Sequence, residues 1–291
     1  MGREIKFVGR DEEGFPEKLS CPAIKPPVKG LWYRGELDPR LWQKCAAVVG
    51  SRKMSRYGKQ VLGELIPRLV GSGYTIVSGL MYGVDQEAHK LTLECGGLAL
   101  AVLGYGIGHK SEEGAFRLAQ KIEEKGLLLS EYEGDARGQT WTFPQRNRLV
   151  VGLSDVVFVV EAGERSGSLN TASWAVRMKK KLYAVPGSVF SNVSMGTNKL
   201  IESGTARVLT TSTLASLLGQ STKEAGMPVS TQQLGEKDRL IWTSLKLNGP
   251  SSINELTRSS GLSSREVLVS LASMEMRELV WQERGVWSIL Y

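Results

Sequence analysis

Histidine and cysteine are scarce in this chain, which has two histidines and three cysteines among 291 residues. Cys21, Cys45 and Cys95 have neither the paired spacing of a disulfide framework nor the spacing of metal ligands, so the sequence predicts no metal site and a reducing cytoplasm. His89 and His109 alone leave little material for histidine-based catalysis. This scarcity argues against a zinc enzyme and against a secreted disulfide scaffold.

Long apolar runs are also lacking. No stretch is long enough to span a bilayer, and the first residues, Met-Gly-Arg-Glu-Ile-Lys, do not have the apolar core of a signal peptide. Acidic residues are outnumbered: 37 Lys and Arg against 30 Asp and Glu give a net charge of +7 and a pI of about 9.3. A basic chain is compatible with a polyanionic partner, and the position of the charge decides whether it indicates one.

The chain is predicted to form two domains joined by a linker. Residues 1–44 contain five prolines and are expected to form a short, irregular N-terminal arm on the main domain. Residues 45–219 alternate apolar strands with helical segments, which predicts an α/β fold with a Rossmann-like, mostly parallel sheet covered by helices. Residues 220–234, rich in Ser, Thr, Gln and Gly, are predicted to be a polar linker. Three short helical segments and a hairpin in 235–291 predict a small C-terminal winged-helix domain.

The stretch from Val156 to Thr171 carries the main functional signal. Its first five residues are apolar, which predicts a strand buried on both faces, and the following Ser-Gly-Ser-Leu-Asn-Thr predicts a turn and a helix N-terminus. The amides of such a terminus attract anions, hydroxyls of Ser166, Ser168 and Thr171 add donors, and Gly167 permits a phosphate to approach. The alternative is a capped helix whose donors are satisfied by its own side chains.

Two further turns at predicted strand ends carry glycine or positive charge. Gly50-Ser51-Arg52-Lys53 opens a basic segment without an acid, where an anionic partner would relieve the conflict between cations and the helix dipole; a solvated helix start is the alternative. Gly79 and Gly83 permit close approach by a phosphate or by a neighbouring loop. Asp85 is interpreted as a helix cap rather than a catalytic base.

The glycines of Gly104-Tyr105-Gly106-Ile107-Gly108 are not interpreted as a dinucleotide fingerprint, because they follow the third predicted strand and have a different spacing. No cofactor is therefore expected.

The segment Phe143-Pro144-Gln145-Arg146-Asn147-Arg148 is predicted to be a short connector that enters a helix around 147–153. On such a connector Phe143 is suited to stack on a base, and Arg146 and Arg148 are suited to contact phosphates of unpaired nucleic acid. The alternative places Phe143 in the core and the arginines on the surface. Lys199, in another Gly/Ser/Thr-rich helix start, could reach the same site.

The predicted winged-helix domain is electrically neutral. From Gly235 to Tyr291 there are seven basic and seven acidic residues, so the whole net charge of +7 lies earlier in the chain. The expected recognition helix, Ser263 to Leu279, has a net charge of −1. Because neutralised phosphates supply most non-specific affinity for DNA, a protein contact is favoured over duplex binding for this domain.

Several motifs follow one another along the chain. They are Gly50-Ser51-Arg52, Ser78-Gly79-Leu80-Met81-Tyr82-Gly83-Val84-Asp85, Phe143 to Arg148 with Gly152-Leu153-Ser154, Val160-Glu161-Ala162 through Ser166 to Ala172, Val185-Pro186-Gly187 and Asn198-Lys199-Leu200-Ile201. Together they resemble the DprA family of DNA-processing proteins, also called Smf. The resemblance runs from about Phe15 to Thr211, and the C-terminal segment resembles that family's optional winged-helix extension.

The resemblance implies a cytoplasmic bacterial protein without catalytic residues. Such a protein binds single-stranded DNA, dimerises through its Rossmann-like domain and loads a RecA-type recombinase during natural transformation. By motif, Arg52 would contact the DNA backbone and Phe143 would stack a base. Gly167, Ser168 and Thr171 would line the phosphate pocket, with Lys199 at its rim.

The chain departs from the family pattern at two places. The helical N-terminal domain usual in the family is expected to be truncated, and His109-Lys110 replaces the common Tyr-Pro after the third-strand glycines.

Two other functions are weighed against single-stranded DNA binding. The fold and the Ser-Gly-Leu-Met-x-Gly stretch are similar to nucleotide-binding phosphoribohydrolases of the lysine-decarboxylase-like group, but Trp174 stands where their catalytic Glu would be. Glu161 is the nearby substitute, and it is interpreted as a cap on turn amides. A transcription factor that reads duplex DNA with its C-terminal domain is disfavoured by that domain's neutrality.

Overall fold

A computed structural model describes residues 4–109, 113–219, 234–277, 279–283 and 285–289. The chain divides into two compact units, Met1–Ala225 and Gly226–Tyr291. The predicted linker, 220–234, lies outside the described residues except for Leu234, and the division into four predicted segments stays a prediction. In the described part of the chain, no helix is long and apolar enough to cross a membrane.

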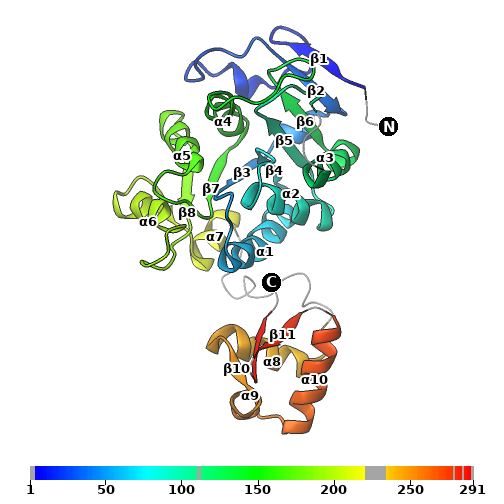
Figure 1. Ribbon diagram of the computed structural model, residues 1–291, viewed down its shortest axis with the longest axis vertical. Helices are drawn as coiled ribbons and strands as arrows, with labels where there is room; N and C mark the ends of the chain where they lie inside the picture. The colour runs from blue at the N-terminus through cyan, green and yellow to red at the C-terminus, as the bar shows by residue number, and fades with distance from the viewer. Residues whose placement is uncertain (1–3, 110–112, 220–233, 278, 284, 290–291) are drawn as a thin grey trace. The chain divides into compact units, whose positions relative to one another are not determined.

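The first unit is built on one mixed sheet, whose strands in the described residues have the order β1-β2-β6-β5-β4-β3-β7-β8-β9 (Figure 1). Seven of them pair in parallel: β3 (Cys45–Val49), β4 (Thr75–Ser78), β5 (Ala99–Leu103), β6 (Leu127–Ser130), β7 (Val156–Val159), β8 (Lys181–Ala184) and β9 (Arg207–Val208). The predicted Rossmann-like fold class is thus confirmed.

The N-terminal residues were expected to be irregular, but two of their segments are strands that extend this sheet. Strands β1 (Lys6–Gly9) and β2 (Gly30–Gly35) form an antiparallel pair, and β2 adds to β6 with Trp32 opposite Ser130. Phe15 and Leu19 from the same region are buried in the core. The arm is therefore tied to the main domain by backbone hydrogen bonds as well as by apolar packing.

Strand side chains alternate between two apolar layers, as the period of a β-strand requires. In β3, Cys45, Ala47 and Val49 face one layer, whereas Ala46 and Val48 face the other. All five are buried, so the sheet needs helices on both sides.

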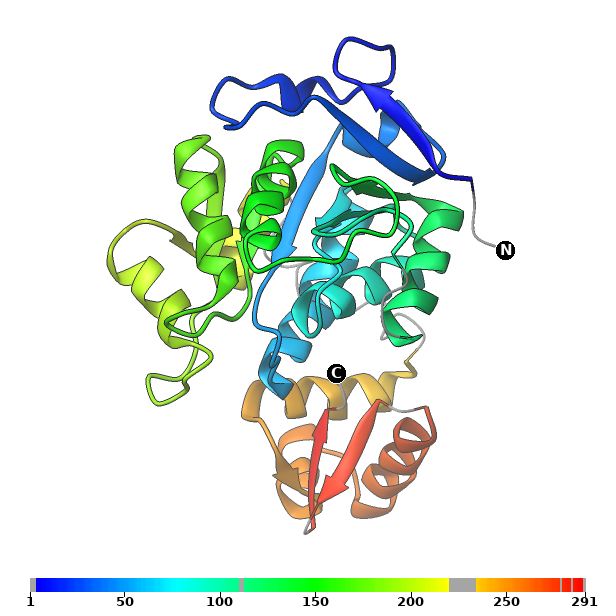
Figure 2. The ribbon, with the colours of Figure 1, turned by 45° about the horizontal axis from the view of Figure 1, so that its top comes forward.

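The helices cover these two faces (Figure 2). One face is covered by α4 (Thr142–Leu153), α5 (Gly167–Arg177) and α6 (Met195–Glu202). The other is covered by α1 (Arg56–Gly71), α2 (Val84–Glu94), α3 (Glu113–Lys125) and α7 (Thr211–Leu218).

Chain order places a switch point between β3 and β7. From β3 the chain proceeds outward through β4, β5 and β6, then returns to β7 on the other side of β3 and proceeds through β8 to β9. The turns that leave β3 and β7 therefore diverge and open a crevice at the carboxyl ends of the strands, where doubly wound sheets bind ligands.

The helix α4 begins earlier than predicted. The sequence predicted a helix only around 147–153, but Phe143 to Arg148 already lie in its first two turns. Its N-cap, Trp141, makes no side-chain capping hydrogen bond, so the sequence carried no signal for this start. The segment is a packed helix rather than a connector.

The second unit has the winged-helix architecture that the sequence predicts. Its described elements are α8 (Glu236–Asn248), β10 (Ser251–Ser252), α9 (Ile253–Ser260), α10 (Ser264–Met276), β11 (Val280–Glu283) and β12 (Val286–Ile289). Capping boxes start α9 at Ser252 and α10 at Ser263, each with a Glu three residues on. The three strands form a small antiparallel sheet.

Candidate functional site

A cleft of about 680 Å³ opens at the switch point. The turns after β3, β4 and β7 and the first turns of α4 and α5 form its walls. The predicted site residues that line it are Gly50, Ser51, Arg52, Lys53, Gly79, Phe143, Arg146, Asn147, Ser166, Gly167, Ser168 and Thr171. Three predicted site residues, Gly83, Arg148 and Lys199, are not part of its lining.

The charge of the cleft is predominantly positive. Among its lining residues the cations are Arg52, Lys53, Arg146 and Arg165, and the acid is Asp85, which is buried. The first two cations are exposed on the turn after β3. Clefts lined by charge of one sign concentrate ligands of the opposite sign, so this cleft suits an anion.

Arg52 and Phe143 meet across the cleft. The guanidinium carbon of Arg52 lies 5.7 Å from the centroid of the Phe143 ring, within the range of a cation–π contact. The ring is half-buried and its edge is fixed by two glycines: a Cβ on Gly104 or Gly138 would come within 2.7 or 2.5 Å of it. The structure thus holds an aromatic ring in a defined position beside the charge of an exposed arginine.

The turn after β4 is filled by the protein itself. The Asp85 carboxylate accepts hydrogen bonds from the amides of Gly79, at 3.2 Å, and Met81, at 3.4 Å. Burial raises the pKa of Asp85. These contacts agree with the interpretation of Asp85 as a cap and leave those two amides occupied.

The two glycines of this turn serve contacts within the chain. A Cβ on Gly79 would lie 2.5 Å from the guanidinium of Arg146. Gly83 has a positive φ of 77°, and a Cβ there would lie 2.3 Å from the carbonyl oxygen of Ser51. The structure therefore supports the explanation that these glycines permit close approach by a neighbouring part of the chain, rather than by a phosphate.

The arginines of α4 require a correction. Arg146 is 3% exposed, and its Nη1 donates to the carbonyl oxygens of Gly79, at 2.7 Å, and Val102. Arg148 is 1% exposed and donates to Glu131 at 2.7 Å. The expectation that both offer exposed guanidinium forks to phosphate is therefore wrong: the helical start of α4 turns both side chains toward the sheet.

The N-terminus of α5 is capped only weakly by its own side chain. The Ser166 hydroxyl accepts from the Ser168 amide at 3.4 Å and lies 2.8 Å from the Ser168 hydroxyl. Gly167 is exposed, with open space around its Cα, and its amide has no acceptor among the described residues. The helix start thus keeps a donor available on the cleft wall.

Asn147 joins the two helices of this wall. Its side-chain amide donates to the carbonyl oxygen of Gly167, at 3.4 Å, and to the Asn170 side chain, at 3.3 Å. A role in positioning α5 against α4 follows directly from these contacts.

Some lining residues were not predicted. Arg165 is exposed beside Ser166, and its position next to the predicted anion turn could have indicated it. Gly138, Thr140 and Val193 come from irregular segments with no recognisable motif, so nothing in the sequence pointed to them.

Glu161 is the carboxylate that would have to replace the missing catalytic Glu of a phosphoribohydrolase, and it is hydrogen-bonded within the fold. It is 2% exposed and accepts hydrogen bonds from the Ser55 amide, at 2.9 Å, and from the Ser55 hydroxyl. Trp174 is half-buried, with the Arg177 guanidinium 5.0 Å from its ring centroid. These contacts support the interpretation of Glu161 as a cap at the start of α1.

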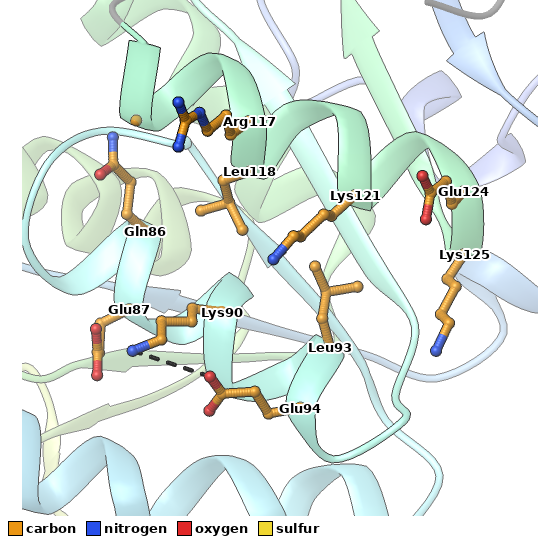
Figure 3. A pocket seen from close by; sticks show the side chains of 11 residues that line it. Gln86, Glu87, Lys90, Leu93, Glu94, Arg117, Leu118, Lys121, Glu124 and Lys125 are labelled. Atoms are coloured by element: carbon orange, nitrogen blue, oxygen red, sulfur yellow. Dashed lines mark ion pairs between the residues drawn. The ribbon is translucent and has the colours of Figure 1, made fainter.

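A second concavity, between α2 and α3, differs in charge (Figure 3). Basic and acidic side chains both line it, with Lys90 3.9 Å from Glu94. Its charged lining residues are Glu87, Lys90, Glu94, Arg117, Lys121, Glu124 and Lys125. This near balance of charge does not suit a polyanion, and no predicted site residue lies there.

Fold and site together define a Rossmann-like α/β protein with a cationic cleft at its strand ends. Residues 6–218 match the family model of the DNA recombination-mediator protein A, and the chain belongs to that family, whose members are also called DprA or Smf.

Relatives with known names support this assignment. A DNA processing protein DprA of Mycobacterium tuberculosis is 34% identical over 269 residues, which cover 89% of this chain and 68% of the relative. DprA of Bacillus subtilis is 35% identical over 62% of this chain and 61% of its own length, and the protein Smf of Escherichia coli is 39% identical over 68% and 52%. The chain thus spans between half and about two thirds of the length of these relatives.

Two solved structures have the same fold. DprA of Streptococcus pneumoniae superposes with a TM-score of 0.68 at 34% identity and covers 74% of each chain. DprA of Helicobacter pylori superposes with a TM-score of 0.65 at 30% identity, over 75% of this chain and 99% of that one. The latter structure is described as giving insight into that protein's single-stranded DNA binding mode.

Proposed function

We propose that this chain binds single-stranded DNA in the switch-point cleft. The observation that carries the proposal is the meeting of Arg52, the Phe143 ring and the start of α5 on one cationic surface. Sequence-tolerant binding of unpaired strands needs cations for the backbone and an aromatic ring for a base, and this cleft supplies both. The single-stranded DNA binding of the Helicobacter pylori relative supports the choice of ligand.

The proposed site residues would contact different parts of the DNA strand. Arg52, Lys53 and the additional Arg165 are exposed and would neutralise phosphates. Phe143 would stack on a base. Lys199 is exposed on α6 and would act at the rim, outside the cleft itself.

The start of α5 would hold a phosphate through the Gly167 amide and the hydroxyls of Ser166, Ser168 and Thr171. Arg146 and Asn147 would act by positioning the turns around it, through the contacts to Gly79 and Gly167.

The wider proposal is that the protein protects incoming DNA and loads a RecA-type recombinase in natural transformation, as a cytoplasmic homodimer that associates through its Rossmann-like domain. Membership in a recombination-mediator family supports this role. The C-terminal unit would serve a protein contact, because it is neutral and α10 exposes Val269 (65%) and Met276 (83%). Loading is tested by whether the protein speeds assembly of such a recombinase on DNA coated with single-strand-binding protein.

Fluorescence anisotropy of labelled oligothymidine and of a duplex of the same length, at two salt concentrations, tests the DNA site. Phe143→Ala should weaken oligothymidine binding by about 1–3 kcal/mol, the range of base–aromatic stacking. Lys53→Ala should also weaken it. Lys121→Ala should not, because it removes an exposed lysine from the second concavity, between α2 and α3. Equal affinity of all four proteins would exclude the cleft as the site.

A further inference from the structure

The loop between β8 and α6 presents an isolated aromatic ring to solvent. Phe190 is 94% exposed and its neighbour Val189 is 77% exposed. A fully hydrated phenylalanine forgoes the stabilisation that burial of its ring would give. Such exposure needs a functional explanation if contacts with the rest of the fold hold the loop in place.

Hydrogen bonds hold both ends of the loop in place. Asn198 brackets Gly187: its side-chain oxygen accepts from the Gly187 amide at 3.1 Å, and its side-chain nitrogen donates to the Gly187 carbonyl at 3.0 Å. The Tyr57 hydroxyl donates to the carbonyl of Pro186 at 2.9 Å. A buried Ser194 completes the turn through its amide, which donates to Ser191 at 2.9 Å.

The same loop continues the wall of the cleft. Val193 lines the cleft, three residues from Phe190, so their Cα atoms are at most about 11 Å apart. The carbonyl of Asn192 lies so near Gly163 that a Cβ there would be 3.1 Å from it. Gly196 donates its amide to Ala162 at 2.8 Å, which fixes the start of α6 to the turn that precedes α5.

We propose that Phe190 is a second stacking platform for a base of the same DNA strand, at the point where the strand leaves the cleft beyond the start of α5. This inference rests on the proposed function. The exposed cations Arg165 and Lys199 lie on the two elements that adjoin the loop and would hold the intervening phosphates.

The surroundings of the ring favour a base over a protein partner. Protein interfaces have a contiguous apolar centre, whereas polar Ser188, Ser191 and Asn192 flank the pair of apolar residues at this loop tip. A base needs only one ring face and tolerates a wet rim.

The test compares full-length wild type, Phe190→Ala, Phe190→Leu and Phe190→Trp by anisotropy, with Leu247→Ala as a control at an exposed apolar residue of the C-terminal unit. On an oligothymidine of about 16 nucleotides, Phe190→Ala and Phe190→Leu should weaken binding by about fivefold or more, and Phe190→Trp should retain it. On about 4 nucleotides, and on an abasic strand of the longer length, all variants should bind like wild type, because no base reaches the ring.

Three results would overturn the proposal. Phe190→Ala with wild-type affinity, while Phe143→Ala is weakened, would refute the second platform and leave the proposed function intact. Retained affinity in Phe190→Leu would show an apolar contact rather than stacking. Normal DNA binding with altered self-association of Phe190→Ala in sedimentation would assign the ring to a protein contact. Failure of wild type to bind any oligonucleotide would instead refute the proposed function itself.

Discussion

The same substitution at two arginines of the cleft should affect two different properties, stability and DNA affinity. Arg146 is buried and donates to two strand-end carbonyl oxygens, whereas Arg52 is exposed over the Phe143 ring. We expect Arg146→Met to lower the stability of the fold and Arg52→Met to lower DNA affinity. Methionine keeps much of the side-chain length in both cases and removes the charge and the donors.

The size of the Arg146 effect follows from its contacts. A hydrogen bond from a charged donor contributes about 1.5–3 kcal/mol, so loss of the bonds to Gly79 and Val102 should cost about 3 kcal/mol or more. Burial raises the pKa of Asp85, and the nearby charge of Arg146 lowers it in part. The substitution would remove that cation from the buried carboxyl group. For a unit of this size the melting temperature should fall by roughly 6–12 °C.

Arg52→Met should keep the free energy of unfolding within about 1 kcal/mol of wild type, since it removes one exposed cation–π contact. Its DNA binding should lose one phosphate contact, which reduces the slope of log K against log salt by about 0.7 for single strands. Arg146→Met, measured well below its melting temperature, should keep the wild-type slope because its guanidinium is buried.

Calorimetry and anisotropy over a salt series separate the two outcomes. The reasoning fails if Arg146→Met melts like wild type, or if its salt slope falls as that of Arg52→Met should. The first result would mean that the hydrogen bonds of Arg146 add little to stability, and the second that its guanidinium contacts phosphate.

Two further predictions concern the helix start and a buried histidine. Gly167→Asp has room for its side chain and places a carboxylate at the start of α5, so the helix should gain about 0.3–1 kcal/mol of stability. The same carboxylate should repel phosphate and weaken oligothymidine binding, and Gly167→Ser is the neutral control. Unchanged DNA affinity of the Asp variant would remove this helix start from the site. His89 is fully buried, and burial lowers its pKa to about 3, below the ordinary 6.5 of the unfolded chain. The unfolded chain therefore binds the proton first, and stability should fall as pH drops below 6.5, by about 2 kcal/mol at pH 5. Denaturant unfolding of wild type and His89→Met at pH 7 and pH 5 checks this, and an equal loss in both would assign the pH dependence to other groups.

Much of the fold was predictable because it depends on local pattern. Alternating strands and helices lead to a parallel sheet, and a parallel sheet brings the turns after its strands to one edge. The apolar run that became β7 and the Ser-Gly-Ser start of α5 are read directly from the sequence. The meeting of Arg52, Phe143 and Ser168 in one cleft follows from that topology.

The direction of individual side chains could not be predicted. The phase of α4 depends on where the helix starts, and Trp141 gives no capping signal there, so Arg146 and Arg148 were expected in solvent although they are buried. The choice between phosphate and protein contacts at Gly79 depends on an arginine 67 residues away in the chain.

The sequence by itself thus determined the alternation of strands and helices from Cys45 onward, the edge of the sheet that bears the cleft, and the residue types available there. The tertiary structure alone decided which amides and guanidiniums remain free, because Asp85, Glu131 and Glu161 bind some of them across the fold. It also decided that Phe190 is held out to solvent, since hydrogen bonds from Asn198 and Tyr57 fix its loop. Local pattern encodes secondary structure, whereas the pairing of polar groups is set by contacts between residues far apart in the chain.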